Sequence, residues 1–510
     1  MRLLFCLESE TSSIELMSLL KALAAKNHSC NVLLAYDFSA RTFSDSARKD
    51  IEDHYQRGIV SEIFSIDLAT NAETAAKHLG SKLDKSPHRT VAQTALDTFL
   101  LFLERLNHRF LNRIRNVFPE KSCRLFDDQW IDRTKTRVRR TRLMFFIYSF
   151  FLDTVDALFK SNTFDAVVLP EEVVGMTWES IVKVCRQNKI PIVVCPYTIA
   201  NQEEAFGNLK HQDEFQTRNN WLAAVRYPRW RLRQDGFDLV RLPEAHIVAH
   251  ERLKLTPPDP WLMNSGHIQA LCVESAANQN YFVESGIPQE RIHVTGSVAL
   301  DEMYEIQQQR DIVAAELAAE MGNTNDRPLL IVSGCPNQLT GAEAPYCEYF
   351  SMEDIAASVA TALAPITTTY NCVIRPHPAF FHFGTMLARY GFHVSNIPTA
   401  QLIAISDLFV AFASSTIRWA VCCGIPTINY DVFHYNFHEY KNTAGVFEVK
   451  TSRELSQRAS ELSFGSPFYQ EVRLSMNSPD GVTTVLDGKS VDRIDTVLKS
   501  LVPQSQPRIQ

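Results

Sequence analysis

The sequence lacks an apolar run long enough to span a bilayer. Its longest apolar block covers residues 143–152, whereas a membrane-spanning helix needs about 20 apolar residues. The first seven residues are also apolar, but Glu8 and Glu10 follow at once, so we expect a buried strand there and not an export signal. We therefore expect a cytoplasmic protein and leave open a peripheral contact with the inner membrane.

Cysteine pairs and an excess of basic charge are missing too. The 11 cysteines include no C-x-x-C pair, which argues against a disulfide framework or a zinc site and favours a reducing compartment. The net charge of −7 disfavours nucleic acid as a partner. The chain also lacks internal repeats, and its 510 residues with 45% hydrophobic content allow two or three ordinary globular domains.

Strand and helix patterns alternate along the chain, which is typical of α/β layers around largely parallel sheets. Apolar runs predict strands at 2–7, 31–36, 166–169, 192–195, 268–273, 292–297, 328–334, 371–374, 408–413 and 425–429. Helical patterns occur at 12–25, 90–118, 136–160, 178–188, 275–285, 301–321, 352–363 and 490–501. We expect two doubly wound, Rossmann-like domains that face a cleft, at 1–300 and 301–485, followed by a helix and a frayed tail at 486–510.

The second expected domain contains two turns suited to binding an anion. The run Ser414-Ser415-Thr416 follows an expected strand and precedes a helical pattern. Hydroxyl groups, the amides of a helix N-terminus and the guanidinium of Arg418 would all favour a phosphate there. Arg375-Pro376-His377-Pro378 follows another strand, and its two prolines would hold Arg375 and His377 at low entropic cost. A histidine that merely caps a turn is the alternative for His377.

The first expected domain offers two further candidates. Glu171 and Glu172 follow the strand at 166–169, where a carboxylate suits general acid or base chemistry or sugar recognition. The alternative is a solvated helical turn whose acids complement the helix dipole. The Gly296-Ser297 pair ends another strand, and glycine allows a ligand to approach the backbone closely. A tight turn explains this pair equally well.

Basic and aromatic residues are mixed in two segments, 133–142 and 226–233. They could bind an anionic membrane surface or a lipid-phosphate acceptor, or they could form solvated helix faces. The run from His434 to His438 has no carboxylate or cysteine at ligand spacing, so we expect no metal site.

The motif set resembles bacterial surface-polysaccharide glycosyltransferases of GT-B fold. The nearest match is to capsule and lipopolysaccharide enzymes that use CMP-Kdo, including the retaining β-Kdo transferases. The residues that carry the resemblance are the 375–378 and 414–426 segments, Thr295-Gly296-Ser297 with Asp301, and the segment 196–201. The first two are shared with CDP-glycerol-type polymerases and, distantly, with sugar-nucleotide 2-epimerases.

The resemblance implies a division of roles between the two domains. The second domain would hold the nucleotide, and the first would hold a glycan or lipid-linked glycan acceptor and supply Glu171 or Glu172 as the catalytic carboxylate. No metal or cofactor beyond the nucleotide-sugar donor is implied. The candidate nucleotide-binding residues are Arg375, His377, Ser414, Ser415, Thr416, Arg418, Gly296 and Ser297.

Two points of detail bear on the donor and the stereochemistry. Many GT-B enzymes carry a ribose-binding glutamate where this chain has Trp419, which disfavours a UDP-sugar donor and favours CMP-Kdo. A retaining double displacement would need a second, nucleophilic carboxylate, for which Asp213, Asp259 and Glu204 are all candidates.

The other hypotheses for the function are a CDP-glycerol-type phosphotransferase, a sugar-nucleotide 2-epimerase, and a non-catalytic nucleotide- or glycan-binding component of a polysaccharide assembly complex.

Overall fold

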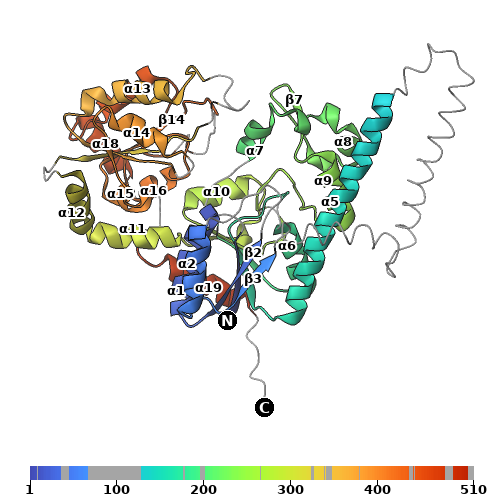
Figure 1. Ribbon diagram of the computed structural model, residues 1–510. Helices are drawn as coiled ribbons and strands as arrows, with labels where there is room; N and C mark the ends of the chain where they lie inside the picture. The colour runs from blue at the N-terminus through green and yellow to red at the C-terminus, as the bar shows by residue number, and fades with distance from the viewer. Residues whose placement is uncertain are drawn as a thin grey trace, which may run out of the picture.

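The computed structural model contains two α/β domains that lie side by side (Figure 1). It describes residues 1–7, 10–35, 45–66, 128–175, 178–195, 202–264, 266–322, 327–337, 339, 347–377, 380–435, 440, 443–476 and 486–502. The expected helix at 90–118, the segment 196–201, Pro378 and the tail from 503 onward lie outside these residues. Among the described helices, none is both long enough and apolar enough to cross a membrane.

The first domain is built on a parallel sheet of seven strands in the order β3-β2-β1-β4-β5-β8-β9. The strands are β1 (Arg2–Leu7), β2 (Ser29–Ala35), β3 (Ile63–Ile66), β4 (Ala166–Leu169), β5 (Ile192–Val194), β8 (Ala270–Val273) and β9 (Ile292–Val294). Leu3, Phe5 and Leu7 of β1 contribute to one core cluster, and Leu4 and Cys6 to another. Successive side chains of a strand point to opposite faces, so a run of apolar residues is what a sheet covered on both faces requires.

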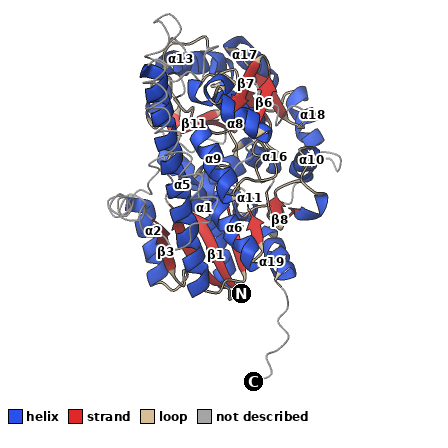
Figure 2. Cartoon of the chain, turned by 90° about the vertical axis from the view of Figure 1, so that its right-hand side faces the viewer, coloured by secondary structure: helices blue, strands red, loops and turns tan. Residues whose placement is uncertain are grey.

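Helices cover both faces of this sheet (Figure 2). Helices α1 (Glu10–Ala25) and α2 (Asp45–Gln56) pack on one face, and α5 (Asp128–Ser161), α6 (Trp178–Asn188) and α10 (Ala276–Glu284) pack on the other. An insertion follows β5. It comprises α7 (Gln202–Leu209), α8 (Trp221–Arg226), the antiparallel hairpin β6 (Arg231–Gln234) and β7 (Phe237–Val240), and α9 (Glu244–Leu253).

The second domain has a parallel sheet of six strands in the order β12-β11-β10-β13-β14-β15. These are β10 (Leu329–Ser333), β11 (Asn371–Arg375), β12 (His393–Val394), β13 (Leu408–Ala411), β14 (Thr427–Tyr430) and β15 (Val446–Val449). Its helices are α12 (Arg310–Met321), α13 (Met352–Leu363), α14 (His382–Ala388), α15 (Thr399–Ile405), α16 (Ile417–Cys422), α17 (Ser452–Glu461) and α18 (Pro467–Met476). The expected pair of doubly wound, Rossmann-like domains is confirmed.

Each sheet reverses its strand order once, between β1 and β4 in the first domain and between β10 and β13 in the second. In doubly wound sheets, ligands bind beyond the carboxyl ends of the strands at this topological switch point. The residues that follow these four strands are therefore the first place to look for a functional site.

The chain crosses between the domains twice. Helix α11 (Val298–Gln308) leads into the second domain, and α19 (Ser490–Leu501) returns to the first (Figure 1). We expected a single bridging helix at 301–321, which is wrong, because the chain bends at Gln309, whose backbone is not helical (φ −119°, ψ 30°), before α12 begins. This bend lets α11 contact α1 and α19 of the first domain as well as α15 of the second, while α12 packs in the second domain.

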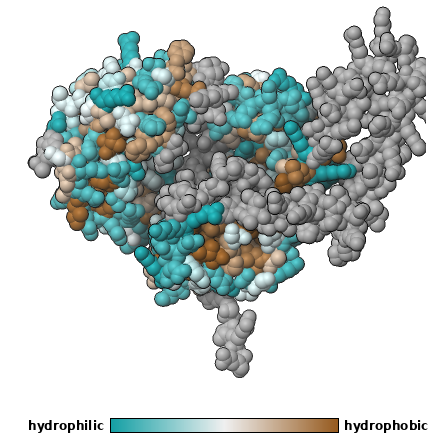
Figure 3. Space-filling model, in the orientation of Figure 1, coloured by the Kyte–Doolittle hydropathy of each residue, from teal (hydrophilic) through white to brown (hydrophobic). Residues whose placement is uncertain are grey.

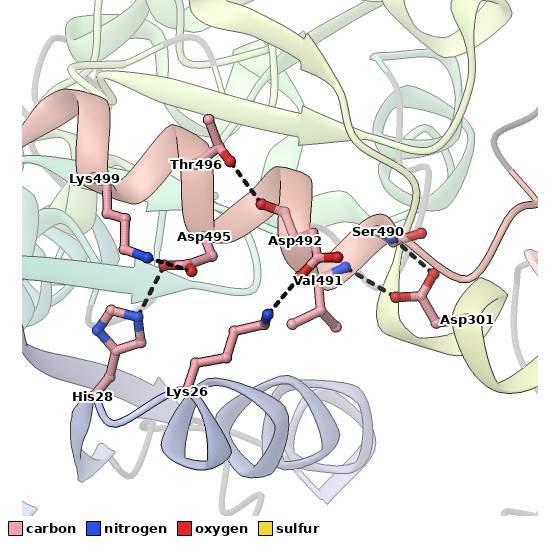
Figure 4. A network of polar contacts seen from close by, with 9 residues as sticks. All are labelled: Lys26, His28, Asp301, Ser490, Val491, Asp492, Asp495, Thr496 and Lys499. Atoms are coloured by element: carbon pink, nitrogen blue, oxygen red, sulfur yellow. Dashed lines mark hydrogen bonds and ion pairs between the residues drawn. The ribbon is translucent and has the colours of Figure 1, made fainter.

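Helix α19 is held on the first domain by polar contacts at its start and along one side (Figure 4). Asp301 of α11 accepts hydrogen bonds from the backbone amides of Ser490 and Val491, at 2.8 and 2.9 Å. These amides begin a helix and have no partner within it, so the carboxylate acts as a cap. Farther along, His28 Nε2 lies 2.9 Å from Asp495 Oδ1, and Leu498 is buried in the core of the first domain.

Candidate functional site

The carboxyl ends of β10 and β11 lie side by side in the second sheet, and β10 borders the switch point. Ser333 pairs with Arg375 across these strands. The next residue, Gly334, lies so close to the 376–377 backbone that a Cβ built on it would stand 1.8 Å from the His377 nitrogen. The absence of a side chain at Gly334 therefore allows the two loops to touch and fixes where His377 lies.

We expect Gly334→Ala to destabilise the second domain. The added methyl group would force the backbone of Pro376 and His377 to move, and overpacking of this kind costs ~1–3 kcal/mol. Urea denaturation that compares the transition midpoints of the two proteins would measure the loss. An unchanged midpoint would mean that the 334 and 376–377 loops do not touch in solution.

Polar atoms without partners gather at this edge. The Nε of Arg375 and the Oγ of Ser333 are buried and have no hydrogen-bond partner among the described residues. His377 is half-buried, and burial lowers the pKa of its imidazole below the usual value, so the ring is neutral at pH 7. Buried polar groups are normally paired. The arrangement indicates a place where a polar or anionic ligand would complete the hydrogen bonding.

The Ser414–Thr416 turn follows β13 at the other side of the switch point. Ala413 has a left-handed backbone (φ 45°) and its amide donates to Asn429 Oδ1 at 2.9 Å, which redirects the chain here. Ser414 Oγ lies 2.9 Å from Thr416 Oγ1. All three turn residues are half-buried, so their hydroxyl groups lie at the surface of this edge.

The helix after this turn differs from the one we expected. Helix α16 has only six residues, and the amides of Ile417, Arg418 and Trp419 already donate to carbonyl groups of residues 414–416 at 3.0–3.3 Å. The helix therefore presents fewer open amides than the sequence suggested. Any anion held at the turn would depend mainly on the serine and threonine hydroxyl groups.

Arg418, which we expected to bind a phosphate, makes ion pairs with two carboxylates of the first domain. Its side chain is only 5% exposed, and it reaches the first domain, where Nη2 lies 2.8 Å from Glu15 Oε1 and Nη1 lies 3.4 Å from Glu274 Oε1. Its Cζ also sits 5.5 Å from the ring centre of Trp419. The guanidinium therefore joins the two domains, and its role as a phosphate ligand stays a prediction.

Gly296 and Ser297 lie on the first domain at the end of β9. Gly296 adopts a positive φ of 77°, and its amide donates to the Val273 carbonyl at 3.1 Å, so a tight turn accounts for the glycine. Ser297 precedes α11, and its buried Oγ has no hydrogen-bond partner among the described residues. Because β8 and β9 are paired, this turn lies one strand away from Glu274.

At the switch point of the first sheet, Glu171 and Glu172 follow β4 and both are buried. The Glu172 carboxylate accepts a hydrogen bond from the Gly266 amide at 3.1 Å, and a Cβ on Gly266 would stand 1.9 Å from Glu172 Oε1. Burial, together with the nearby charge of Glu179, raises the pKa of Glu172 to about 7. Glu172 therefore anchors its loop against residue 266, and Glu171 precedes it at the same end of β4.

Beneath this loop the structure contains a polar network that the sequence analysis missed. Glu179 Oε1 accepts a hydrogen bond from the Gly175 amide at 2.6 Å and lies 2.9 Å from His250 Nε2. The Tyr148 hydroxyl forms a hydrogen bond of 2.9 Å with His246 Nδ1. Burial lowers the pKa of His246 to about 4. The sequence pattern that could have predicted this network is the spacing of His246 and His250. They are four residues apart, so both rings lie on one face of α9.

The candidates for a nucleophilic carboxylate have different surroundings. Asp213 is largely exposed and pairs with Arg218 at 2.6 Å. Asp259 accepts a hydrogen bond from the Trp261 amide at 2.8 Å. Glu204 belongs to α7, and its side chain lies outside the described residues. The choice among them stays open.

Comparison with known proteins finds similarity only among solved structures, since no family model and no curated protein matches the chain. A UDP-GlcNAc 2-epimerase from Neisseria meningitidis aligns over 98% of this chain and 100% of its own, with 11% identity and a TM-score of 0.49. The calicheamicin glycosyltransferase aligns over 99% of both chains, with 13% identity and a TM-score of 0.49. A glycosyltransferase from Rickettsia africae also covers 99% of both, with 9% identity and a TM-score of 0.44. Similarity at this level carries no conclusion about what this chain binds or catalyses.

Proposed function

We propose that this chain is a glycosyltransferase that moves Kdo from CMP-Kdo onto a growing bacterial surface polysaccharide or lipopolysaccharide glycan. The observation that carries the proposal is a pair of buried polar atoms, Ser333 Oγ and Arg375 Nε, that lack a partner among the described residues. They lie at the carboxyl ends of β10 and β11, on the edge of the sheet that also carries the hydroxyl-rich turn at 414–416. The choice of CMP-Kdo rests on the sequence resemblance and on Trp419.

In this proposal the second domain stabilises the leaving nucleotide. Negative charge develops on the phosphate as the bond to the sugar breaks, and a fixed guanidinium is the strongest side-chain partner for it. Arg375 supplies that charge, while the neutral His377 and the hydroxyl groups of Ser414 and Ser415 donate hydrogen bonds. These donors are held in place before the reaction by β11 and by the turn after β13.

The first domain supplies the carboxylate. Glu171 follows β4 at the switch point, where it would take the proton from the acceptor hydroxyl as that oxygen attacks the sugar. Glu172 holds the loop through the Gly266 amide. The acceptor is a glycan or a lipid-linked glycan bound on this side of the site.

A thermal-shift screen with CMP, CDP, UDP and GDP tests the nucleotide, because a ligand that binds only the folded state raises the melting temperature. We expect CMP to give the largest shift and CMP-Kdo to release CMP when a glycan acceptor is added. Conversion of UDP-GlcNAc would instead establish the epimerase, and transfer from CDP-glycerol the phosphotransferase. Failure of CMP-Kdo to release CMP with every surface-glycan acceptor would overturn the proposal.

We expect Arg375→Ala to weaken CMP binding by ~10–100-fold, since a hydrogen bond to a charged group contributes about 1.5–3 kcal/mol. Arg375→Lys should recover only part of the affinity, because an ammonium group cannot reproduce the planar fork. Arg389→Ala, at an exposed arginine that follows α14, is the matched control and should bind CMP normally. Isothermal titration calorimetry measures all three, and equal affinity of Arg375→Ala and Arg389→Ala would exclude Arg375 from the site.

A further inference from the structure

Helix α8 exposes its large apolar residues to solvent, whereas an ordinary surface helix buries them. Trp221, Leu222 and Val225 are 55%, 45% and 71% exposed, whereas the small residues Ala223 and Ala224 are buried. We call these three exposed residues the α8 face. In the view of Figure 3 most of the described surface is hydrophilic, and hydrophobic residues appear in small patches. Large apolar side chains gathered on one short helix indicate a surface that meets another apolar phase.

The α8 face is rigidly mounted. The Asn220 amide group donates to the carbonyls of Glu214 and Gln216 at 2.7 and 3.0 Å, and its Oδ1 accepts from the Glu244 amide at 2.7 Å. The buried side of α8 packs in a small core with Trp230 and Val174. The exposed side chains are therefore held outward by the fold and do not need to reorganise before they bind.

The same small core connects the α8 face to the candidate site. Val174 belongs to the loop that carries Glu171 and Glu172, and it packs with Ala223 and Ala224 of α8. Helix α8 packs on α9, and α9 packs along α5, in the same part of the first domain (Figure 1). A surface that binds the α8 face would thus lie next to the acceptor side of the site.

The charge around α8 determines which partner fits. Residues 217–233 include five arginines and no acidic residue, in a chain with a net charge of −7, and Arg218 pairs with Asp213. Arg226, at the end of α8, is exposed and makes no ion pair with a described residue. Arg233 is 68% exposed, although it shares Asp238 with Arg231, and Arg229 pairs with Glu251. Apolar side chains rimmed by arginine match a membrane with anionic headgroups.

We propose that the α8 face docks this protein on an anionic membrane surface, with Trp221, Leu222 and Val225 at the headgroup level and Arg226 and Arg233 on lipid phosphates. Tryptophan prefers this interfacial depth because its ring is apolar and its N–H is polar. The inference goes beyond the proposed function, since it requires neither a nucleotide nor a transfer reaction.

Flotation of the full-length protein with vesicles tests the proposal directly. We expect binding to vesicles of phosphatidylglycerol and phosphatidylethanolamine, weak binding to phosphatidylcholine, and release as salt is raised, because salt screens charges at the surface. The double variant Trp221→Ser/Val225→Asn should reduce partition by about tenfold or more, and Arg226→Glu should reduce binding to anionic vesicles alone. All substituted side chains are exposed, so the variants should fold.

Leu474→Asn is the matched control, because Leu474 is a 73% exposed apolar residue on α18 of the second domain. It should bind anionic vesicles as the unaltered protein does. Equal flotation of the α8 double variant and Leu474→Asn would overturn the proposal, as would equal binding to anionic and zwitterionic vesicles. Concentration-dependent dimerisation that the double variant abolishes, without vesicle binding, would show that a second copy occupies the face and would also overturn it.

Discussion

Replacing Glu171 with glutamine should lower the rate of sugar transfer from CMP-Kdo by ~10²–10⁴-fold, because an amide cannot accept the proton of the acceptor hydroxyl. The affinity for CMP should be unchanged, since Arg375, His377 and the 414–415 hydroxyl groups, which are proposed to stabilise the leaving nucleotide, lie on the second domain. Steady-state measurement of CMP release, combined with calorimetric titration of CMP, separates these two effects. The fall should appear in kcat at saturating acceptor.

Glu172→Gln provides the comparison for this result. The glutamine carbonyl can still accept the hydrogen bond from the Gly266 amide, so the loop should keep its place and the loss should stay below about tenfold. A larger loss for Glu172→Gln than for Glu171→Gln would reassign the proton acceptor to Glu172. Full activity in both variants would exclude a carboxylate of this loop from the chemistry and favour the non-catalytic hypothesis for the chain.

The sequence was most informative where burial alone determines structure. The runs at 3–7 and 166–169 predict strands because a parallel strand covered on both faces needs apolar side chains at every position, and both are strands in the structure. The position of Glu171 after β4 follows from the same pattern. The apolar run places the residues that follow it at a sheet edge without any knowledge of how the strands pair.

Contacts between distant segments were beyond the reach of the sequence. Glu179 and His250 lie 71 residues apart, and no local pattern indicates that α6 and α9 bring them together. Arg418 illustrates the same limit, because its position one residue into a short helix suggested a phosphate ligand. Tertiary structure alone determines which domain faces that helix and which carboxylates the facing domain carries.

The second large effect is expected at Arg418. The Arg418 guanidinium forms ion pairs with two nearly buried carboxylates, Glu15 and Glu274, across the domain interface. Arg418→Met would leave both acids facing each other without a positive partner, and removal of one member of a buried ion pair costs about 3–5 kcal/mol. Denaturation of the full chain near pH 8 should show this loss, with the first domain and the second domain unfolding at different denaturant concentrations once their contact is weakened.

The loss should depend on pH with a definite sign. Burial raises the pKa of Glu15 to about 7, with Arg418 opposing this shift and Glu274 adding to it. Because the folded state then holds more protons than the unfolded state between about pH 4.5 and 7, the stability that this carboxyl contributes falls as the pH rises through that window. Arg418→Met removes the opposing charge, which raises the pKa of Glu15 further. The variant should therefore lose more stability near pH 8 than near pH 5, where Glu15 is protonated.

A triple variant, Arg418→Met with Glu15→Gln and Glu274→Gln, is the matched control for charge. It removes the buried acids together with their partner, so most of the stability should return, as it does when a whole buried charge cluster is replaced. The phosphate-binding alternative makes the opposite prediction. In that case Arg418→Met would weaken CMP binding, its stability loss would be equal near pH 5 and pH 8, and the added glutamines would restore nothing.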